Sequence, residues 1–206
     1  MQSNLTDPDS RGMYKRGAFT QGYNAQATVD AEGSMLLLGI SIVQSSSDMG
    51  QLVSGVTSVD PSLGPITSVL ADAGYAKASE IEDLEAMGIE AFVAVCANDR
   101  RELDYRPLPS VEQIAAKEAS RKRRARELKN PTLVAMKAKL ETDEGRKVYR
   151  LRQQTVEPIF GTVKFVLGFR EFRMRGLTGV ETEWKLVGLA CNIRRLATLT
   201  KLKKTA

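Results

Sequence analysis

Hydrophobic and polar residues alternate in the N-terminal part of the chain in a way that predicts strands. Residues 23–29 alternate, residues 30–33 read as a polar turn, and residues 35–43 form a second, more apolar run. Two such runs around a short turn favour a β-hairpin. Residues 1–20 are rich in polar residues and turn formers, so we expect them to be irregular.

Short apolar runs and helical segments continue the pattern up to residue 97. Asp48 and Ser79 are good N-caps and precede two of the expected helices. Strands and helices in this order predict an α/β fold, with a mixed sheet once the hairpin is included. The elements expected after the hairpin are a helix at 50–59, a buried strand at 66–70, a helix at 80–87 and a strand at 90–96.

The pattern changes at residue 98. Residues 98–148 are charged and lack strand periodicity, which predicts a basic helical insertion outside the sheet core, with helices at 110–128 and from Asn130. We therefore divide the chain into a sheet part at 1–97, this insertion, and C-terminal helices at 149–206.

Helical spacing dominates the rest of the chain. We expect a helix from residue 144 with a kink or break near Val156, because Pro158 suits only the first turn of a helix. Apolar residues at helical spacing over 181–199 predict a closing amphipathic helix.

The net charge of +5 hides a strong asymmetry along the 206 residues. The first 97 residues carry 4 Lys and Arg against 12 Asp and Glu, a balance of −8. Residues 98–148 carry 14 against 9, or +5, and residues 149–206 carry 12 against 4, or +8. A polyanion such as DNA would therefore bind the second half. Solvated helix faces are the alternative explanation.

The sequence contains no histidine, which excludes His-based triads, His general bases and His-containing zinc sites. Cys96 and Cys191 are far apart, cannot form a zinc site by themselves and demand no disulfide. Carboxylates with Mg²⁺ or Mn²⁺ remain the main option for catalysis. No stretch is apolar enough to cross a membrane and no signal peptide is recognisable, so we expect a cytoplasmic protein.

Two carboxylates are candidates for such chemistry. Asp72 follows the strand at 66–70, where α/β sheets place ligands, and Gly74 permits a sharp turn there. Glu157 precedes Lys164 by seven residues, or two helical turns, so both project from the same face. Arg150 would join that face if the helix were unbroken. A turn or cap role for Asp72 and an exposed, salt-bridged helix around Glu157 are the alternatives.

Four motifs stand out along the chain: G-Y-N-A-Q-A-T-V-D at 22–30, L-A-D-A-G-Y at 70–75, V-E-P-I-F-G-T-V-K at 156–164 and R-G-L-T-G-V-E-T-E-W-K-L-V-G-L-A-C-N-I-R-R-L at 175–196. In this order they resemble insertion-sequence transposases with an RNase H-like DDE domain. The resemblance covers nearly the whole chain and is weakest in 98–148. It implies an RNase H-like mixed sheet flanked by helices, and DNA transposition by metal-dependent phosphodiester cleavage and strand transfer.

The resemblance also implies roles for single residues. Asp72 corresponds to the second catalytic Asp and Glu157 to the catalytic Glu, both as ligands of Mg²⁺ or Mn²⁺. Tyr149, Arg152, Glu157 and Lys164 match a family signature of Tyr, Arg, Glu and Lys. Four residues separate Arg152 from Glu157 where three are common, so Gln153 and Arg150 are alternatives for the Arg position. The residues expected to hold DNA are Tyr149, Arg150, Arg152, Lys164, Arg121, Lys122, Arg123, Arg124, Arg170, Arg173 and Arg175.

The first catalytic Asp of such enzymes lies on the first strand, before the motif at 22–30. Asp7 and Asp9 do not lie in a strand pattern, and Asp30 is better explained by a turn. We therefore expect that strand, its Asp and any N-terminal DNA-binding domain to be absent, and this chain alone to be inactive. Two alternatives stay open: a non-catalytic DNA-binding remnant of a mobile element, and an RNase H-like nuclease of another kind, such as a resolvase. Homo-oligomerisation is also open.

Overall fold

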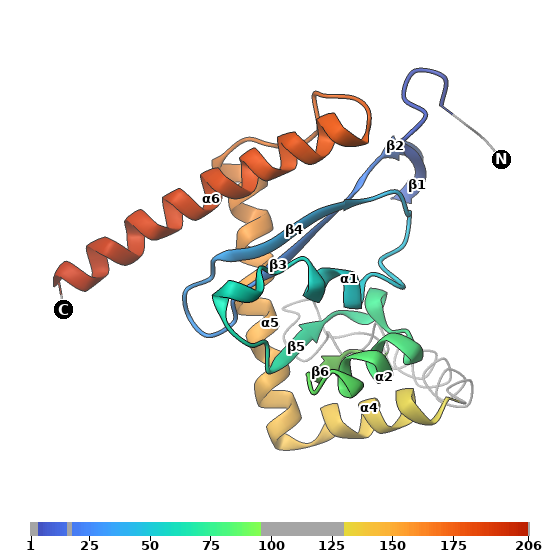
Figure 1. The fold of residues 1–206 in the computed structure, drawn as a ribbon, viewed down its shortest axis with the longest axis vertical. Helices are drawn as coiled ribbons and strands as arrows, with labels where there is room; N and C mark the ends of the chain where they lie inside the picture. Colours follow the sequence, from blue (N-terminus) through green and yellow to red (C-terminus); the bar gives the residue numbers. More distant parts are fainter. Residues whose placement is uncertain (1–3, 16–17, 96–129, 206) are drawn as a thin grey trace, which may run out of the picture.

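A computed structural model describes residues 4–15, 18–95 and 130–205. These parts form a mixed α/β structure of small sheets and helices (Figure 1). The expected helix at 110–128, Cys96 and the basic run Arg121–Arg124 lie outside the described residues. The elements are β1 (Arg11–Lys15), β2 (Ala18–Gly22), β3 (Asn24–Val29), β4 (Leu37–Val43), α1 (Leu52–Thr57), η1 (Pro61–Leu63), β5 (Ser68–Ala71), η2 (Ala73–Tyr75), α2 (Ala78–Ala86), β6 (Glu90–Val93), α4 (Pro131–Glu141), α5 (Asp143–Gly161), the π-helix η4 (Thr162–Val166) and α6 (Leu177–Thr205).

The expected hairpin is confirmed as β3 and β4. The two strands pair antiparallel, from Asn24 opposite Val43 to Val29 opposite Leu37. The carboxylate of Asp30 closes the turn by accepting a hydrogen bond from the backbone N–H of Ser34, at 2.9 Å. The turn role predicted for Asp30 is therefore confirmed.

The N-terminal segment is not irregular, as its composition led us to expect. β1 and β2 form a second antiparallel hairpin, with Tyr14 opposite Phe19 and their ring centroids 5.0 Å apart. Both rings are largely exposed, at 67% and 80%. No core face forces apolar and polar residues to alternate in these strands, so the pattern gave no strand signal.

Both predicted helix caps were wrong. α1 begins at Leu52, and its first N–H donates to the buried carboxylate of Glu80, 2.7 Å away, rather than to Asp48. α2 begins at Ala78 after Lys77, so Ser79 lies inside the helix. Glu80 belongs to α2, so a side chain distant in sequence caps α1. Local pattern reasoning cannot find such a cap.

The strands do not join into the single mixed sheet that we expected. The described strands form three two-stranded sheets, β1–β2, β3–β4 and the parallel pair β5–β6. The open edges of β3 and β5 line opposite sides of a cleft, and none of the described strands lies between them. The mixed α/β content was predicted correctly, whereas the pairing of the hairpin with β5 was not.

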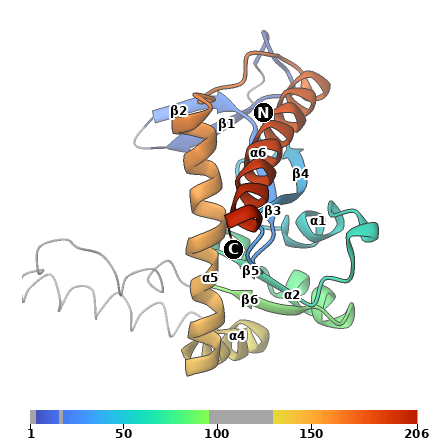
Figure 2. The same cartoon turned by 90° about the vertical axis from the view of Figure 1, so that its left-hand side faces the viewer.

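α4 and α5 meet at a tight corner, and α5 then runs along most of the molecule's height (Figures 1 and 2). The described part of the expected insertion contributes to the core, because Met136 and Leu140 of α4 are buried with β6. α5 continues as one helix through Pro158 to Gly161, so the helix does not break near Val156.

The core is divided into two clusters. One gathers α1, α2, β5, β6 and α4 around Ile81 and Leu84. The other packs β3 and β4 against α5 and α6 around Val180 and Trp184. α5 joins both, through Tyr149 at one end and Ile159 at the other. None of the described helices is long and apolar enough to cross a membrane.

Candidate active site

A cleft of about 1010 Å³ separates the two halves of the molecule. Residues 24–32 line one side and residues 63–72 the other, and α5 forms the wall between them. Asp72, Arg152, Glu157 and Lys164 all line this cleft, together with the aromatic ring of Phe160. The two candidate carboxylates and the predicted lysine are therefore exposed to one common space.

Asp72 follows β5 directly, at the position that the sequence predicted. Its Oδ1 accepts a hydrogen bond from the backbone N–H of Gly74, at 2.8 Å, and so caps the turn η2. Its Oδ2 lies 4.0 Å from Nη1 of Arg152. The carboxylate thus has one oxygen fixed by the turn and the other directed toward α5.

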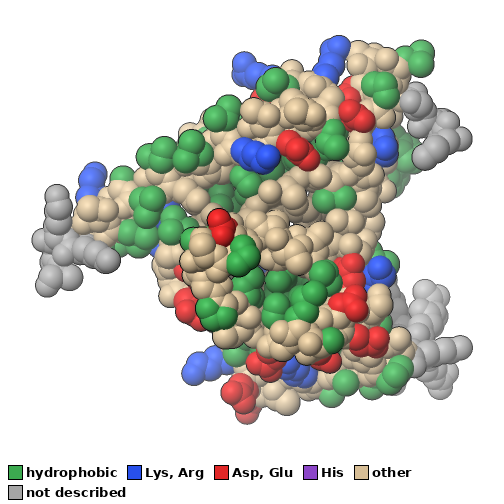
Figure 3. Space-filling model, in the orientation of Figure 1, with side chains coloured by type: hydrophobic (Ala, Val, Ile, Leu, Met, Phe, Trp, Pro, Cys, Tyr) green, Lys and Arg blue, Asp and Glu red, His purple; other side chains and the backbone are tan. Residues whose placement is uncertain are grey.

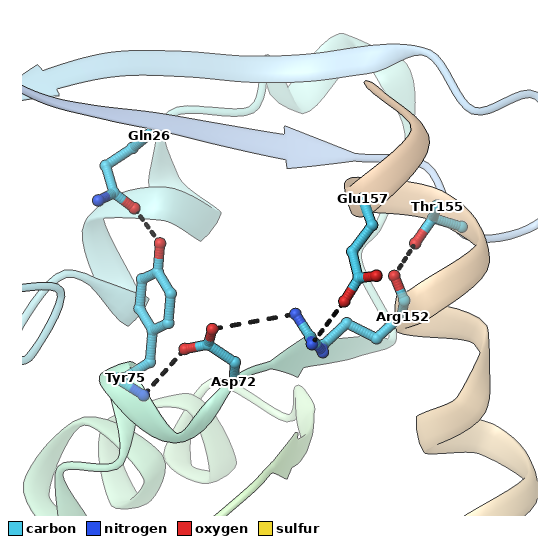
Figure 4. A network of polar contacts seen from close by, with 7 residues as sticks. Gln26, Asp72, Tyr75, Arg152, Thr155 and Glu157 are labelled. Carbon is cyan, nitrogen blue, oxygen red and sulfur yellow. Dashed lines mark hydrogen bonds and ion pairs between the residues drawn. The ribbon is translucent and has the colours of Figure 1, made fainter. Parts of the chain in front are cut away.

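Arg152 links the two carboxylates (Figure 4). Its Nη2 donates to Oε1 of Glu157, 3.3 Å away on the same helix. The side chain of Arg152 is only 8% exposed, whereas that of Glu157 is 58% exposed. Burying a guanidinium is costly unless carboxylates pair with it, so Asp72 and Glu157 compensate this charge. The structure thereby places Arg152, rather than Gln153 or Arg150, beside Glu157.

The donors of Arg152 are not all satisfied. Its Nε is buried and has no hydrogen-bond partner among the described residues. A buried donor without an acceptor costs about 1–3 kcal/mol. The open cleft beside it is the natural source of such an acceptor.

Four polar residues extend the site and were not among the predicted site residues. Asp48 accepts hydrogen bonds from the side-chain amides of Asn24, at 2.8 Å, and Gln26, at 2.9 Å. The hydroxyl of Tyr75 donates to Oε1 of Gln26. Burial raises the pKa of Tyr75 well above its ordinary value, and the charges of Asp48 and Asp72 raise it further. Tyr75 is therefore a neutral donor at physiological pH. Asp48 lies five residues after the end of β4, whereas Asp72 comes directly after β5, so position along the chain marked Asp48 less clearly.

The other described residues predicted to bind DNA fall into three groups. Lys164 is exposed at the cleft, with its Nζ 5.9 Å from the ring centroid of Phe160. Arg150 is exposed but does not line the cleft, although the helix is unbroken, and Tyr149 packs against the first core cluster. The exposed arginines of the segment between η4 and α6 are Arg170, Arg173 and Arg175.

The three carboxylates considered as replacements for a first catalytic Asp have other partners. Asp7 and Asp9 accept from the backbone N–H groups of Gly176, at 3.3 Å, and Leu177, at 3.0 Å, where α6 begins. Asp30 is held in its turn. The described ranges contain no group of three Asp, Glu, Cys or His side chains that could hold a metal ion.

The model of the transposase DDE domain family matches residues 3–193. No curated protein and no solved structure gave a match. The family match extends over both core clusters and includes the cleft with Asp72 and Glu157. The chain is therefore a member of the transposase DDE domain family.

Proposed function

We propose that this chain acts in DNA transposition, through metal-dependent phosphodiester cleavage and strand transfer in the cleft. The observation that carries the proposal is the linkage of Asp72 and Glu157 through Arg152 at the wall of an open cleft. Acidic side chains from a strand end and a facing helix suit catalysis with Mg²⁺ or Mn²⁺. The sequence contains no histidine that could act as a general base or zinc ligand instead.

We propose Asp72 and Glu157 as the ligands of Mg²⁺ or Mn²⁺. Both present carboxylate oxygens, the donors that these ions prefer. The fit is partial, because Asp48 lines the same cleft but the described residues contain no group of three acidic side chains that could hold a metal ion together. A bound ion would act as a Lewis acid toward the phosphodiester.

In this proposal the basic residues at and near the cleft orient the two carboxylates and bind the DNA backbone. Arg152 offsets the repulsion between the two carboxylates and fixes their separation. Lys164, exposed at the same cleft, would contact a DNA phosphate, where it supplies affinity rather than sequence recognition. Arg170, Arg173 and Arg175 would extend this contact along the backbone.

A non-catalytic DNA-binding role is the second candidate. The absence of a third acidic ligand among the described residues favours it. DNA would then bind through the basic second half of the chain without being cut. Metal-dependent products therefore separate the two candidates, and simple nicks without joined products would indicate an RNase H-like nuclease instead.

We also propose that the chain forms a homodimer through α6. Four large apolar residues of α6 are at least half exposed and follow one another at intervals of three or four residues: Leu186, Leu189, Ile193 and Leu196. Hydrophobic side chains are exposed along α6 on the face shown in Figure 3. This spacing is typical of helices that pair with each other. Glu181 near the start of the stripe and Arg194 toward its end favour antiparallel pairing of two copies.

The decisive experiment is a Mn²⁺- or Mg²⁺-dependent strand-transfer assay on DNA carrying transposon ends. The proposed function requires joined products that disappear with Asp72→Asn and with Glu157→Gln. DNA binding that is unaffected by either variant and by the metal, without any products, would favour the non-catalytic role.

A further inference from the structure

The π-helix η4 presents a run of exposed side chains at the edge of the cleft. Residues 164–167 are all exposed, and Phe165 is 78% exposed. The backbone N–H of Leu167 donates to the carbonyl of Thr162, five residues earlier, at 2.9 Å. A turn of this kind holds one residue more than an α-helical turn, so the run faces outward while Val163 stays buried. Such turns occur frequently at functional sites.

The ring of Phe165 stands apart from the other aromatic rings of this part of the chain. Phe160, Phe169 and Phe172 all pack against Trp184 in the second core cluster. Phe165 is not part of that cluster and lines the cleft instead. A single exposed apolar side chain needs no explanation by itself, so the neighbours of the ring decide what it can bind.

Those neighbours are basic. The guanidinium carbon of Arg170 lies 5.7 Å from the centroid of the Phe165 ring. Gly168 lies between the two residues with a φ of +69°, a left-handed conformation that favours glycine and turns the chain back toward the ring. Lys164 precedes the ring and lines the same cleft. A cation over one face of the ring leaves the opposite face available for a second planar group.

An exposed ring between two cations matches the chemistry of a nucleotide. The π-face of a base stacks on an aromatic ring, and basic side chains hold the phosphates on either side of it. Residues 164–175 carry four Lys and Arg against one Glu, so the whole segment suits a polyanion. Inside a duplex both faces of a base are covered by its neighbours. The ring can therefore stack only on a base that is unpaired or turned out of the helix.

We propose that Phe165 holds an unpaired DNA base by stacking, while Lys164 and Arg170 contact the phosphates beside that base. This inference rests on the proposed function, because it takes DNA as the ligand of the cleft, and it adds which part of the DNA is held there. Phe165 lines the same cleft as Asp72 and Glu157, so the stacked base belongs to the strand next to the bond that is cut or joined. Every base has a π-face, and the contact therefore tolerates any sequence.

The experiment compares two single strands of about 12 nucleotides, oligothymidylate and the same backbone without bases, by fluorescence anisotropy. Both carry the same phosphates, so the ratio of their affinities isolates the contribution of the bases. We expect the full chain to prefer oligothymidylate, and Phe165→Ala and Phe165→Leu each to lower this preference by about fivefold or more, because neither side chain has a π-face. Phe165→Trp should keep the preference.

The matched control is Phe19→Ala, which should leave the preference unchanged. Phe19 is 80% exposed on β2 and does not line the cleft. A second readout uses Phe165→Trp. The single natural tryptophan, Trp184, is only 3% exposed, so the variant adds an exposed indole. Oligothymidylate should quench its fluorescence more strongly than the strand without bases does.

The outcomes separate this site from DNA binding in general. A wild-type chain that binds both strands equally, or a preference that survives Phe165→Ala, would overturn the stacking site while DNA binding stands. Equal loss with Phe19→Ala, or equal quenching by both strands, would overturn it as well. A wild-type chain that binds neither strand would refute the proposed function, and this inference with it.

Discussion

The guanidinium of Arg152 lies 3.3 Å from the carboxylate of Glu157, five residues further along the same unbroken helix. On its other side the same guanidinium lies 4.0 Å from Asp72. A cation that binds both carboxylates must therefore compete with a charge that is already part of the protein. This competition shapes what is expected of metal binding.

Metal binding should depend on both carboxylates. We expect Glu157→Gln or Asp72→Asn to weaken Mn²⁺ binding by about tenfold or more, because each variant removes one of two charged oxygen ligands. Electron paramagnetic resonance of free Mn²⁺ measures this directly. Glu144→Gln, an exposed change in the first turn of the same helix, is the control and should leave binding unchanged. Equal affinity in all variants would refute the assignment of ligands.

The 206-residue chain alone should not cleave or join DNA at a useful rate. The described residues lack a third acidic ligand, and a misplacement of about 1 Å in a reacting group can cost on the order of 10²-fold in rate. The measurement is the strand-transfer assay with Mg²⁺ or Mn²⁺. Robust activity that is abolished by Glu157→Gln would contradict this expectation and point to a further carboxylate, such as Asp48 at the same cleft.

DNA affinity should fall when basic residues of the second half are removed. Replacement of Arg121, Lys122, Arg123 and Arg124 by Ala, and separately of Arg170, Arg173 and Arg175 by Ala, should flatten the dependence of log K on log salt. Each lost phosphate contact reduces the slope by about 0.9 on duplex DNA. Fluorescence anisotropy over a series of salt concentrations provides the slopes. An unchanged slope would identify that group as a solvated surface.

Dimerisation should depend on the stripe of α6. Ile193→Glu combined with Leu189→Glu should convert the dimer to monomer, because two charges per copy would be buried between the paired helices. Leu202→Glu is the matched control, since Leu202 is 58% exposed on the same helix but lies off the stripe. Sedimentation velocity measures the species present. A wild-type chain that is monomeric at about 100 μM would rule out the dimer, since an obligate interface is far tighter.

Gly145→Ala should destabilise the protein by about 2–3 kcal/mol. A Cβ at this position would lie 2.1 Å from the carbonyl oxygen of Lys139, a backbone atom that cannot move without displacing the end of α4. Gly161→Ala in the same helix is the control. No atom lies within 4 Å of its added Cβ, so it should be neutral or stabilise by up to about 1 kcal/mol. Urea unfolding compares the two, and similar values for both would contradict the steric argument.

Features of the fold that depend on a local repeat could be predicted from the sequence. The β3–β4 hairpin has a polar turn between two strands that each present a face to the core, and Asp72 follows a β-branched run that ends at a turn. In the N-terminal hairpin, aromatic rings on both strands are exposed. Its sequence therefore lacks the alternation of apolar and polar residues that predicts a strand. Pro158 was taken as a break, yet Ile159 and Val163 around it are buried, and that packing outweighs the local cost of a proline.

The long-range parts of the site could not be predicted for a different reason. That Arg152 joins Asp72 to Glu157 depends on how α5 crosses the end of β5, which no spacing along the chain encodes. The same holds for Glu80, which caps a helix 28 residues earlier in the sequence. Asp48 is an acidic residue in the loop after β4, and in the sequence a helix-cap role explained it equally well.

The position of α5 between the two core clusters also has a mechanical consequence. Tyr149 anchors the helix to one cluster and Ile159 to the other, while the two sheets on either side of the cleft share no backbone ladder. The bending stiffness of about three helical turns between these anchors therefore governs how far the cleft opens. Pro158 leaves one backbone hydrogen bond unmade near the second anchor, so the compliance of the helix is concentrated there. A small flexure at that point changes the width of the cleft while both clusters stay intact.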